Sequence, residues 1–143
     1  MIGNIKIIAV CMCKVYDERN YRIIRALNNF AVENDCRLFV YHTCSDLYWK
    51  TLSEKGEQSV FDLIDYNITD AVVTFEEGVY AENVMTKIRM DAAKYGKPVI
   101  SVGVEHDDCI SIKFGYAKGF EQVVRHVQKQ RHIFVRKIEF CKK

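Results

Sequence analysis

The sequence predicts a three-layer α/β domain in which helices cover both faces of a parallel sheet, as in flavodoxin-like and Rossmann-like folds. Short β-branched runs alternate with longer amphipathic segments along the chain, and strands separated by helical crossovers form parallel sheets. The length of 143 residues fits one domain, and 49% apolar with 28% charged residues is a globular mixture.

The first apolar run, residues 5–11, predicts a buried strand, and Asp17 is the expected N-cap of the helix that follows. That helix should end near Asn34, and a second strand follows at residues 37–42. Apolar residues recur at spacings near 3.6 along the helix. Its predicted inner face consists of Ile23, Ile24, Leu27, Phe30 and Ala31.

The middle of the chain predicts a polar loop with a short helical turn at residues 43–56, a helix at 57–66 and a buried strand at 71–75. The inward residues of that helix should be Val60, Phe61 and Ile64.

A helix is expected over residues 81–95, followed by Gly96 as the C′ residue and Pro98 as a stop. Its inner stripe consists of Val84, Met85, Ile88 and Ala92.

The last part of the chain predicts strands at residues 98–102 and 109–113, a helix at 115–129 and a final strand at 135–141. The inward residues of this last helix should be Phe120, Val123, Val124 and Val127.

Ligands of an open parallel sheet bind beyond the carboxyl ends of its strands. The loops expected at that edge contain polar side chains suited to ligand contact, and each is equally well explained as an ordinary polar loop residue. The candidates are Tyr16, Asp17, Thr43, Ser45, Glu76 and Glu77.

Two familiar phosphate-binding chemistries lack their motifs. A dinucleotide or flavin site needs glycines directly after the first strand, and residues 11–16 contain none. We therefore expect no cofactor. A receiver domain needs clustered carboxylates at the strand ends, but the first strand ends in cysteines and Lys113 is the single fitting feature. A receiver-like signalling domain stays open as an alternative.

The six cysteines predict free thiols packed in a core or cleft. The C-x-C spacing of Cys11 and Cys13 differs from that of zinc knuckles and redox sites, so no metal site is expected. Cysteine–histidine pairs such as Cys44 with His42, or Cys13 with His106, are conceivable nucleophiles. The sequence favours buried or cleft-lining thiols instead.

The formal net charge of +2 is too small to indicate a nucleic-acid surface. No apolar stretch approaches the ~20 residues of a membrane span. The apolar run at residues 5–10 is too short for a signal peptide and has no cleavage site. We expect a cytoplasmic protein without membrane or direct nucleic-acid contact.

Several short motifs follow one another in a recognisable order: YRIIRAL at residues 21–27, SVFDLI at 59–64, TDAVV at 69–73, YGKPVISVG at 95–103, YAKG at 116–119 and RKIEF at 136–140. In this order they resemble the sensor domains of the lactose-repressor (LacI) family, which share the fold of type 1 periplasmic binding proteins. The resemblance spans almost the whole chain.

The resemblance implies one lobe of a non-catalytic sensor for a small ligand such as a sugar or purine. The parent would be a bacterial transcription regulator or a diguanylate cyclase with this lobe as its sensor. Residues 1–132 would form the lobe. Residues 133–143 would begin the second lobe as a strand that pairs at an edge or is exchanged in a homodimer.

Two departures from the family pattern bear on this interpretation. Gly115 stands where the family has an aspartate that contributes interlobe contacts, and no helix-turn-helix precedes the first strand. The missing aspartate and the cysteine-rich lip of the expected cleft favour a second hypothesis, a dimerisation scaffold that has lost its ligand site.

Overall fold

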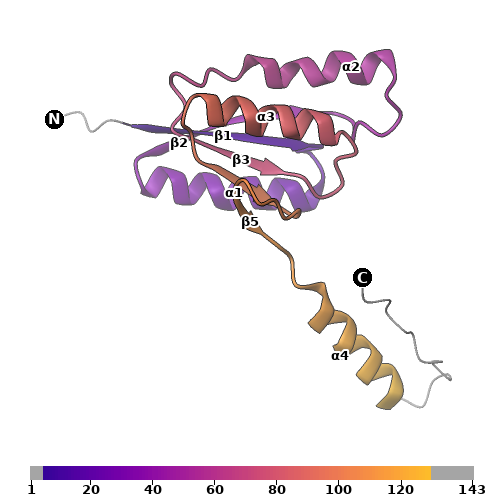
Figure 1. The fold of residues 1–143 in the computed structure, drawn as a ribbon. Helices are drawn as coiled ribbons and strands as arrows, with labels where there is room; N and C mark the ends of the chain where they lie inside the picture. Colours follow the sequence, from indigo (N-terminus) through magenta and orange to yellow (C-terminus); the bar gives the residue numbers. More distant parts are fainter. Residues whose placement is uncertain (1–4, 130–143) are drawn as a thin grey trace. The chain divides into compact units, whose positions relative to one another are not determined.

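The computed structural model describes residues 5–129, which belong to two compact units, residues 1–113 and 114–143. The first unit contains one sheet with the strand order β2-β1-β3-β4-β5 (Figure 1), and every neighbouring pair is parallel. The strands are β1 (Lys6–Cys13), β2 (Cys36–Thr43), β3 (Ala71–Phe75), β4 (Val99–Val102) and β5 (Ile110–Ile112). The predicted α/β class with a parallel sheet is confirmed.

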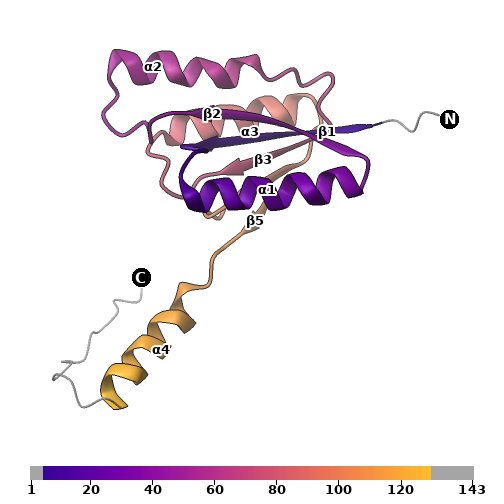
Figure 2. The same ribbon diagram turned by 180° about the vertical axis from the view of Figure 1, so that it is seen from behind.

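Helices cover both faces of this sheet, as Figures 1 and 2 show from opposite sides. Helix α1 (Glu18–Glu33) lies on one face. Helix α2 (Leu52–Gln58), the 3-10 helix η1 (Ser59–Leu63) and helix α3 (Glu82–Lys94) lie on the other. The arrangement is the predicted three-layer, flavodoxin-like lobe.

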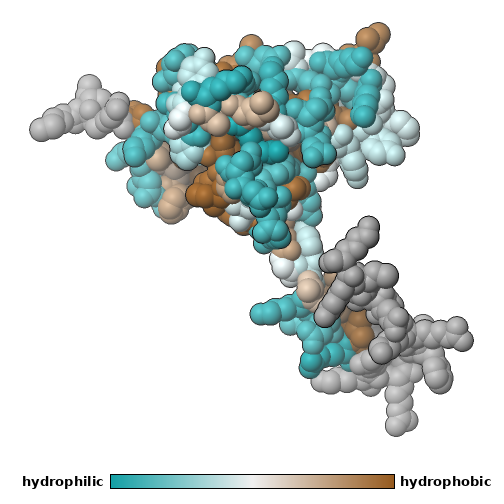
Figure 3. All heavy atoms as spheres, in the orientation of Figure 1, coloured by the Kyte–Doolittle hydropathy of each residue, from teal (hydrophilic) through white to brown (hydrophobic). Residues whose placement is uncertain are grey.

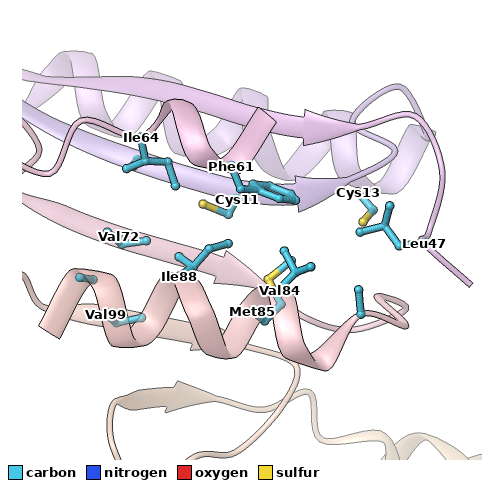
Figure 4. Close-up of a cluster of buried hydrophobic side chains, with 13 residues drawn as sticks. Cys11, Cys13, Leu47, Phe61, Ile64, Val72, Val84, Met85, Ile88 and Val99 are labelled. Carbon is cyan, nitrogen blue, oxygen red and sulfur yellow. The ribbon is translucent and has the colours of Figure 1, made fainter. Parts of the chain in front are cut away.

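The main core lies between the sheet and the α3 face (Figure 4). Alternate residues of a strand point to opposite faces, and those directed to this side include Cys11 and Val72. They pack against Phe61 of η1 and against Met85 and Ile88 of α3, all at most 4% exposed. Burial raises the pKa of the Cys11 thiol far above its ordinary value, so it is a neutral core residue.

The α3 stripe is confirmed in full, because Val84, Met85, Ile88 and Ala92 are all buried. The helix ends as its glycine predicts. Gly96 adopts a φ of 63°, and its N–H donates to the Ala93 carbonyl at 2.9 Å while Lys97 N–H donates to the Ala92 carbonyl at 2.9 Å. This pair of bonds is the Schellman motif.

The predicted helix over residues 57–66 is wrong in both its start and its type. Thr51 and Glu54 form a capping box, with mutual side-chain to backbone hydrogen bonds, and this box starts α2 at Leu52. The 3-10 helix η1 then replaces the α-helix until Leu63. The inward residues are nevertheless as predicted, since Phe61 and Ile64 are buried and Val60 is partly buried.

Helix α1 matches its predicted position, with Asp17 as the N-cap residue but without a side-chain cap bond. Its predicted inner face is wrong at one position, because Phe30 is 66% exposed while the neighbouring Ala31 is buried. Consecutive helical residues differ by about 100° around the axis. Ala31 faces the sheet, and Phe30 therefore points away from it toward solvent.

The second unit contains α4 (Tyr116–Lys129) as its one described element. Phe120, Val123 and Val124 have no packing partner within the described part of this unit, so their inward orientation stays a prediction. The side chain of Val127, the predicted strand 135–141 and the predicted boundary at residue 132 lie outside the described residues. None of the helices in residues 5–129 is long and apolar enough to cross a bilayer.

Candidate functional site

The carboxyl ends of the parallel strands bring four loops to one edge of the sheet, here called the rim: residues 14–17, 44–51, 76–81 and 103–109. The register pairs Cys13 with Thr43 and Phe75 with Val102, so the loops begin at matching heights. All six predicted site residues belong to the strand ends and loops of this rim.

The loops after β1 and β2 are tied together. Lys14 Nζ lies 2.9 Å from Asp46 Oδ2, and this hydrogen bond raises the pKa of Lys14 and lowers that of Asp46. Tyr16 Oη donates to the Cys44 carbonyl at 2.5 Å. The predicted site residue Tyr16 is thereby positioned at the rim with 61% of its surface exposed.

Two predicted site residues are used inside the fold. The Thr43 hydroxyl is buried and lies 2.7 Å from the Ser45 carbonyl and 3.0 Å from Cys13 Sγ. Glu57 Oε2 accepts hydrogen bonds from Cys44 N–H, Ser45 N–H and Ser45 Oγ at 2.8–3.0 Å. Glu57 thus anchors this loop, a role that no sequence motif announces.

Glu76 is the centre of a buried network, here called the Glu76 bracket. Its carboxylate accepts hydrogen bonds from Thr74 Oγ1 and Arg89 Nη1, both at 2.8 Å, and pairs with His106 Nε2 at 2.8 Å. Burial alone would raise the pKa of Glu76. The hydrogen bonds from His106 and Thr74 and the charge of Arg89 outweigh it, so the pKa lies below its ordinary value.

The Glu76 bracket joins β3, α3 and the loop before β5, and it uses both carboxylate oxygens of Glu76. The next residue, Glu77, is directed outward and pairs with Arg19 at 2.6 Å. Gly103 packs against Glu77 so closely that an added Cβ would lie 2.7 Å from Glu77 Cβ. Of the six predicted site residues, Tyr16, Asp17 and Glu77 are therefore the ones exposed to solvent.

An exposed aromatic cluster at the rim was not predicted as part of the site. Tyr48 contacts Trp49 and Tyr80 edge to face, with both centroid distances 4.9 Å. These three residues, here called the aromatic ledge, are 52%, 76% and 57% exposed in that order. The chain's single tryptophan within a polar loop was the one sequence signal that pointed to it.

The backbone on either side of Tyr48 and Trp49 fixes the position of the aromatic ledge. Leu47 and Lys50, on either side of Tyr48 and Trp49, have φ values of 62° and 54°. Leu47 is fully buried, and Asp46 O accepts a hydrogen bond from Tyr80 N–H at 3.0 Å. Left-handed conformations of non-glycine residues cost about 1 kcal/mol or more each and cluster at functional sites.

The conceivable nucleophile pairs are otherwise engaged. His106 pairs with Glu76, and Cys13 accepts from Thr43. Burial, outweighing the hydrogen bond from Thr43, raises the pKa of Cys13, which disfavours the nucleophilic thiolate. Among residues 5–129, no group of three or more His, Cys, Asp or Glu side chains is placed to hold a metal ion.

Comparison with known proteins finds no family model, no curated protein and no solved structure that matches this chain.

Proposed function

We propose that the first unit is a non-catalytic sensor domain for a small ligand, of the LacI-like kind that the sequence motifs resemble. The observation that carries this proposal is the aromatic ledge, an exposed and conformationally fixed cluster at the carboxyl-end rim of a parallel sheet. The parent would be a bacterial regulator whose output is transcription or cyclic-dinucleotide synthesis.

The ledge suits ligands with flat or apolar faces. Aromatic rings bury large apolar area with defined geometry and keep a polar handle in tyrosine and tryptophan. The ring faces of sugars and purines offer matching surfaces. Hydrogen-bonding groups for their polar edges lie at the same rim in Asp17, Tyr16 and the Lys14–Asp46 pair.

The chemistry of the rim supports binding in preference to catalysis. Glu76, the most buried carboxylate of the rim loops, is saturated by three partners. A general acid or base must instead exchange a proton with a substrate within hydrogen-bond reach. The buried thiols Cys11 and Cys13 have raised pKa values, which keeps them protonated.

The proposal is tested by a thermal-shift screen of the full chain with hexoses, pentoses and purine nucleosides. We expect at least one compound to raise Tm saturably, since a ligand of the native state stabilises it by mass action. Tyr80→Ala, which removes one ring of the ledge, should abolish the shift.

The matched control for that variant is Phe30→Ala, which truncates an aromatic ring of similar exposure on α1 (66%). It should leave the shift intact. A panel without any stabilising compound, or equal losses in both variants, would contradict the sensor proposal.

A second candidate, the dimerisation scaffold, is favoured by two observations. Charged residues of the rim are already engaged in ion pairs, Lys14 with Asp46 and Glu77 with Arg19 of α1. The edge strand β5 exposes Ile110 and Ile112 by 63% and 50%, and such edges invite pairing with another chain. A tight homodimer by light scattering at tens of micromolar without any ligand response would favour the scaffold, whereas a monomer would exclude it.

A further inference from the structure

The first unit contains a second candidate site beside α3, whose lining includes no residue of the aromatic ledge. A groove of about 320 Å³ lies between the C-terminal half of α3 and the beginnings of β4 and β5. Its lining includes the charged residues Arg89, Lys97 and Asp108. Figure 3 shows a patch of hydrophobic surface below the position that α3 has in Figure 1. The volume is at the lower end of the usual range for small-molecule sites.

Arg89 supplies a buried donor that has no acceptor. Its side chain is 7% exposed, and its Nη1 is used by the Glu76 carboxylate. Its Nε is buried without a hydrogen-bond partner among the described residues. The nearest carboxylate oxygen is Asp108 Oδ2 at 3.7 Å, which is beyond hydrogen-bond distance. Buried donors are almost always satisfied, so this one indicates an acceptor that residues 5–129 do not provide.

Two opposite charges lie beside this donor. Lys97 forms no ion pair with any residue from 5 to 129, and it is partly buried in the groove wall. Asp108 has a 63% exposed side chain, and its one ion-pair contact within the described part of the chain is the long one to Arg89. The groove therefore offers a cation and an N–H for a carboxylate, and a carboxylate for a cation.

The remaining wall is apolar. Met90, Pro98 and Ile110 line it, and Met90 and Ile110 are more than half exposed. Cys109 also lines the groove. Burial and the neighbouring Asp108 charge raise its pKa, so its thiol is neutral and adds no third charge.

We propose that this groove binds a small aliphatic zwitterion, an α-amino acid whose side chain lies on Met90, Pro98 and Ile110. Its ammonium draws the exposed Asp108 side chain away from Arg89, and its carboxylate then meets Lys97 and the Arg89 Nε thus uncovered. A simple anion would face the repulsion of Asp108 and a simple cation that of Lys97. A zwitterion satisfies both charges and the orphaned N–H. The site is separate from the aromatic ledge, and the proposal does not depend on the proposed sensor function.

The test compares three probes that differ by one group: L-norleucine, hexanoate without the ammonium, and pentylamine without the carboxylate. Binding to the full chain is measured by isothermal titration calorimetry. Norleucine should bind about tenfold or more tightly than either analogue, because each charge-assisted contact that is lost costs about that factor. Equal affinity of the three probes, or no binding of norleucine, would overturn the proposal.

Variants then assign the contacts. Lys97→Met should weaken norleucine and leave pentylamine unchanged, whereas Asp108→Asn should remove the preference for norleucine over hexanoate. Both side chains lie at the groove edge, so the fold should persist where an Arg89 substitution would strand Glu76. Lys94→Met, on the exposed side of α3 (Lys94 side chain 66% exposed), is the control. If it weakens norleucine as much as Lys97→Met does, the assignment fails.

Discussion

The two halves of the rim use their side chains in opposite ways. On the β3–β4 side, the Glu76 bracket is buried and every carboxylate oxygen has a partner. On the β1–β2 side, Tyr48 and Trp49 of the aromatic ledge are exposed and lie between two residues with left-handed backbones. The difference teaches that a polar residue at a strand end is as readily a brace as a ligand contact. Exposed side chains on a conformationally fixed backbone are the better sign of a binding surface.

The largest expected effect comes from breaking the bracket. Arg89→Met should lower the free energy of unfolding by about 3–5 kcal/mol, because it leaves the Glu76 carboxylate buried without its cation. Urea unfolding followed by far-UV circular dichroism measures the loss. The exposed Arg22→Met, whose side chain is 76% accessible, should cost little, and equal losses in the two variants would contradict a buried bracket.

Protonation of Glu76 provides the next test. Its folded-state pKa lies below the ordinary value of 4.5, so its ionised form adds stability above about that pH. This contribution is lost as pH falls through the lower folded-state pKa. Glu76→Gln should lose about 1–3 kcal/mol at pH 7 and show a shallower fall in stability toward pH 3. Parallel pH curves for the variant and the wild type would show that Glu76 does not carry this dependence.

A smaller effect is expected on the ledge side, where Glu57 holds the loop. Glu57→Ala removes one acceptor of three hydrogen bonds and should cost about 1–2 kcal/mol. The freed loop should also lower the fluorescence anisotropy of Trp49, the only tryptophan. A stability loss without any change in anisotropy would mean that Glu57 does not order the ledge.

The smallest effect tests the backbone conformation beside the ledge. Lys50 is exposed and has a φ of 54°, a region in which glycine is free of the steric cost that other residues meet. Lys50→Gly should therefore raise the free energy of unfolding by about 0.5–1 kcal/mol. Lys55→Gly, inside α2, should lower it by about 1 kcal/mol. If Lys50→Gly lowered the free energy of unfolding, the backbone at Lys50 would not be strained.

The sheet was predictable because its signal is local. The run at residues 71–75 is bounded by turn residues and became β3 with the predicted limits, and Gly96 ended α3 as its conformational freedom requires. Helix α2 was misplaced because the capping box of Thr51 and Glu54 competes with the apolar periodicity that favoured residues 57–66. A cap can thus shift a helix that hydrophobic spacing alone locates.

The location of the candidate site could be predicted from the sequence, but the roles of its individual residues could not. Loops at strand ends follow from the parallel topology, which put Tyr16 and Glu77 at the rim as expected. The partners that withdraw Ser45 and Glu76 from ligand contact are Glu57 and Arg89, and both pairings join elements that are separated along the chain. The aromatic ledge depends on the left-handed backbone conformation of Leu47, which a leucine in the sequence does not predict.

Acrylamide quenching of Trp49 is the most direct test of the central claim, that the ledge is the ligand surface. Trp49 is 76% exposed and should be quenched efficiently in the free protein. The compound that raises Tm most in the screen should shield it and lower the quenching constant in step with saturation. An unchanged quenching constant at a concentration that fully raises Tm would place the ligand elsewhere and contradict the account.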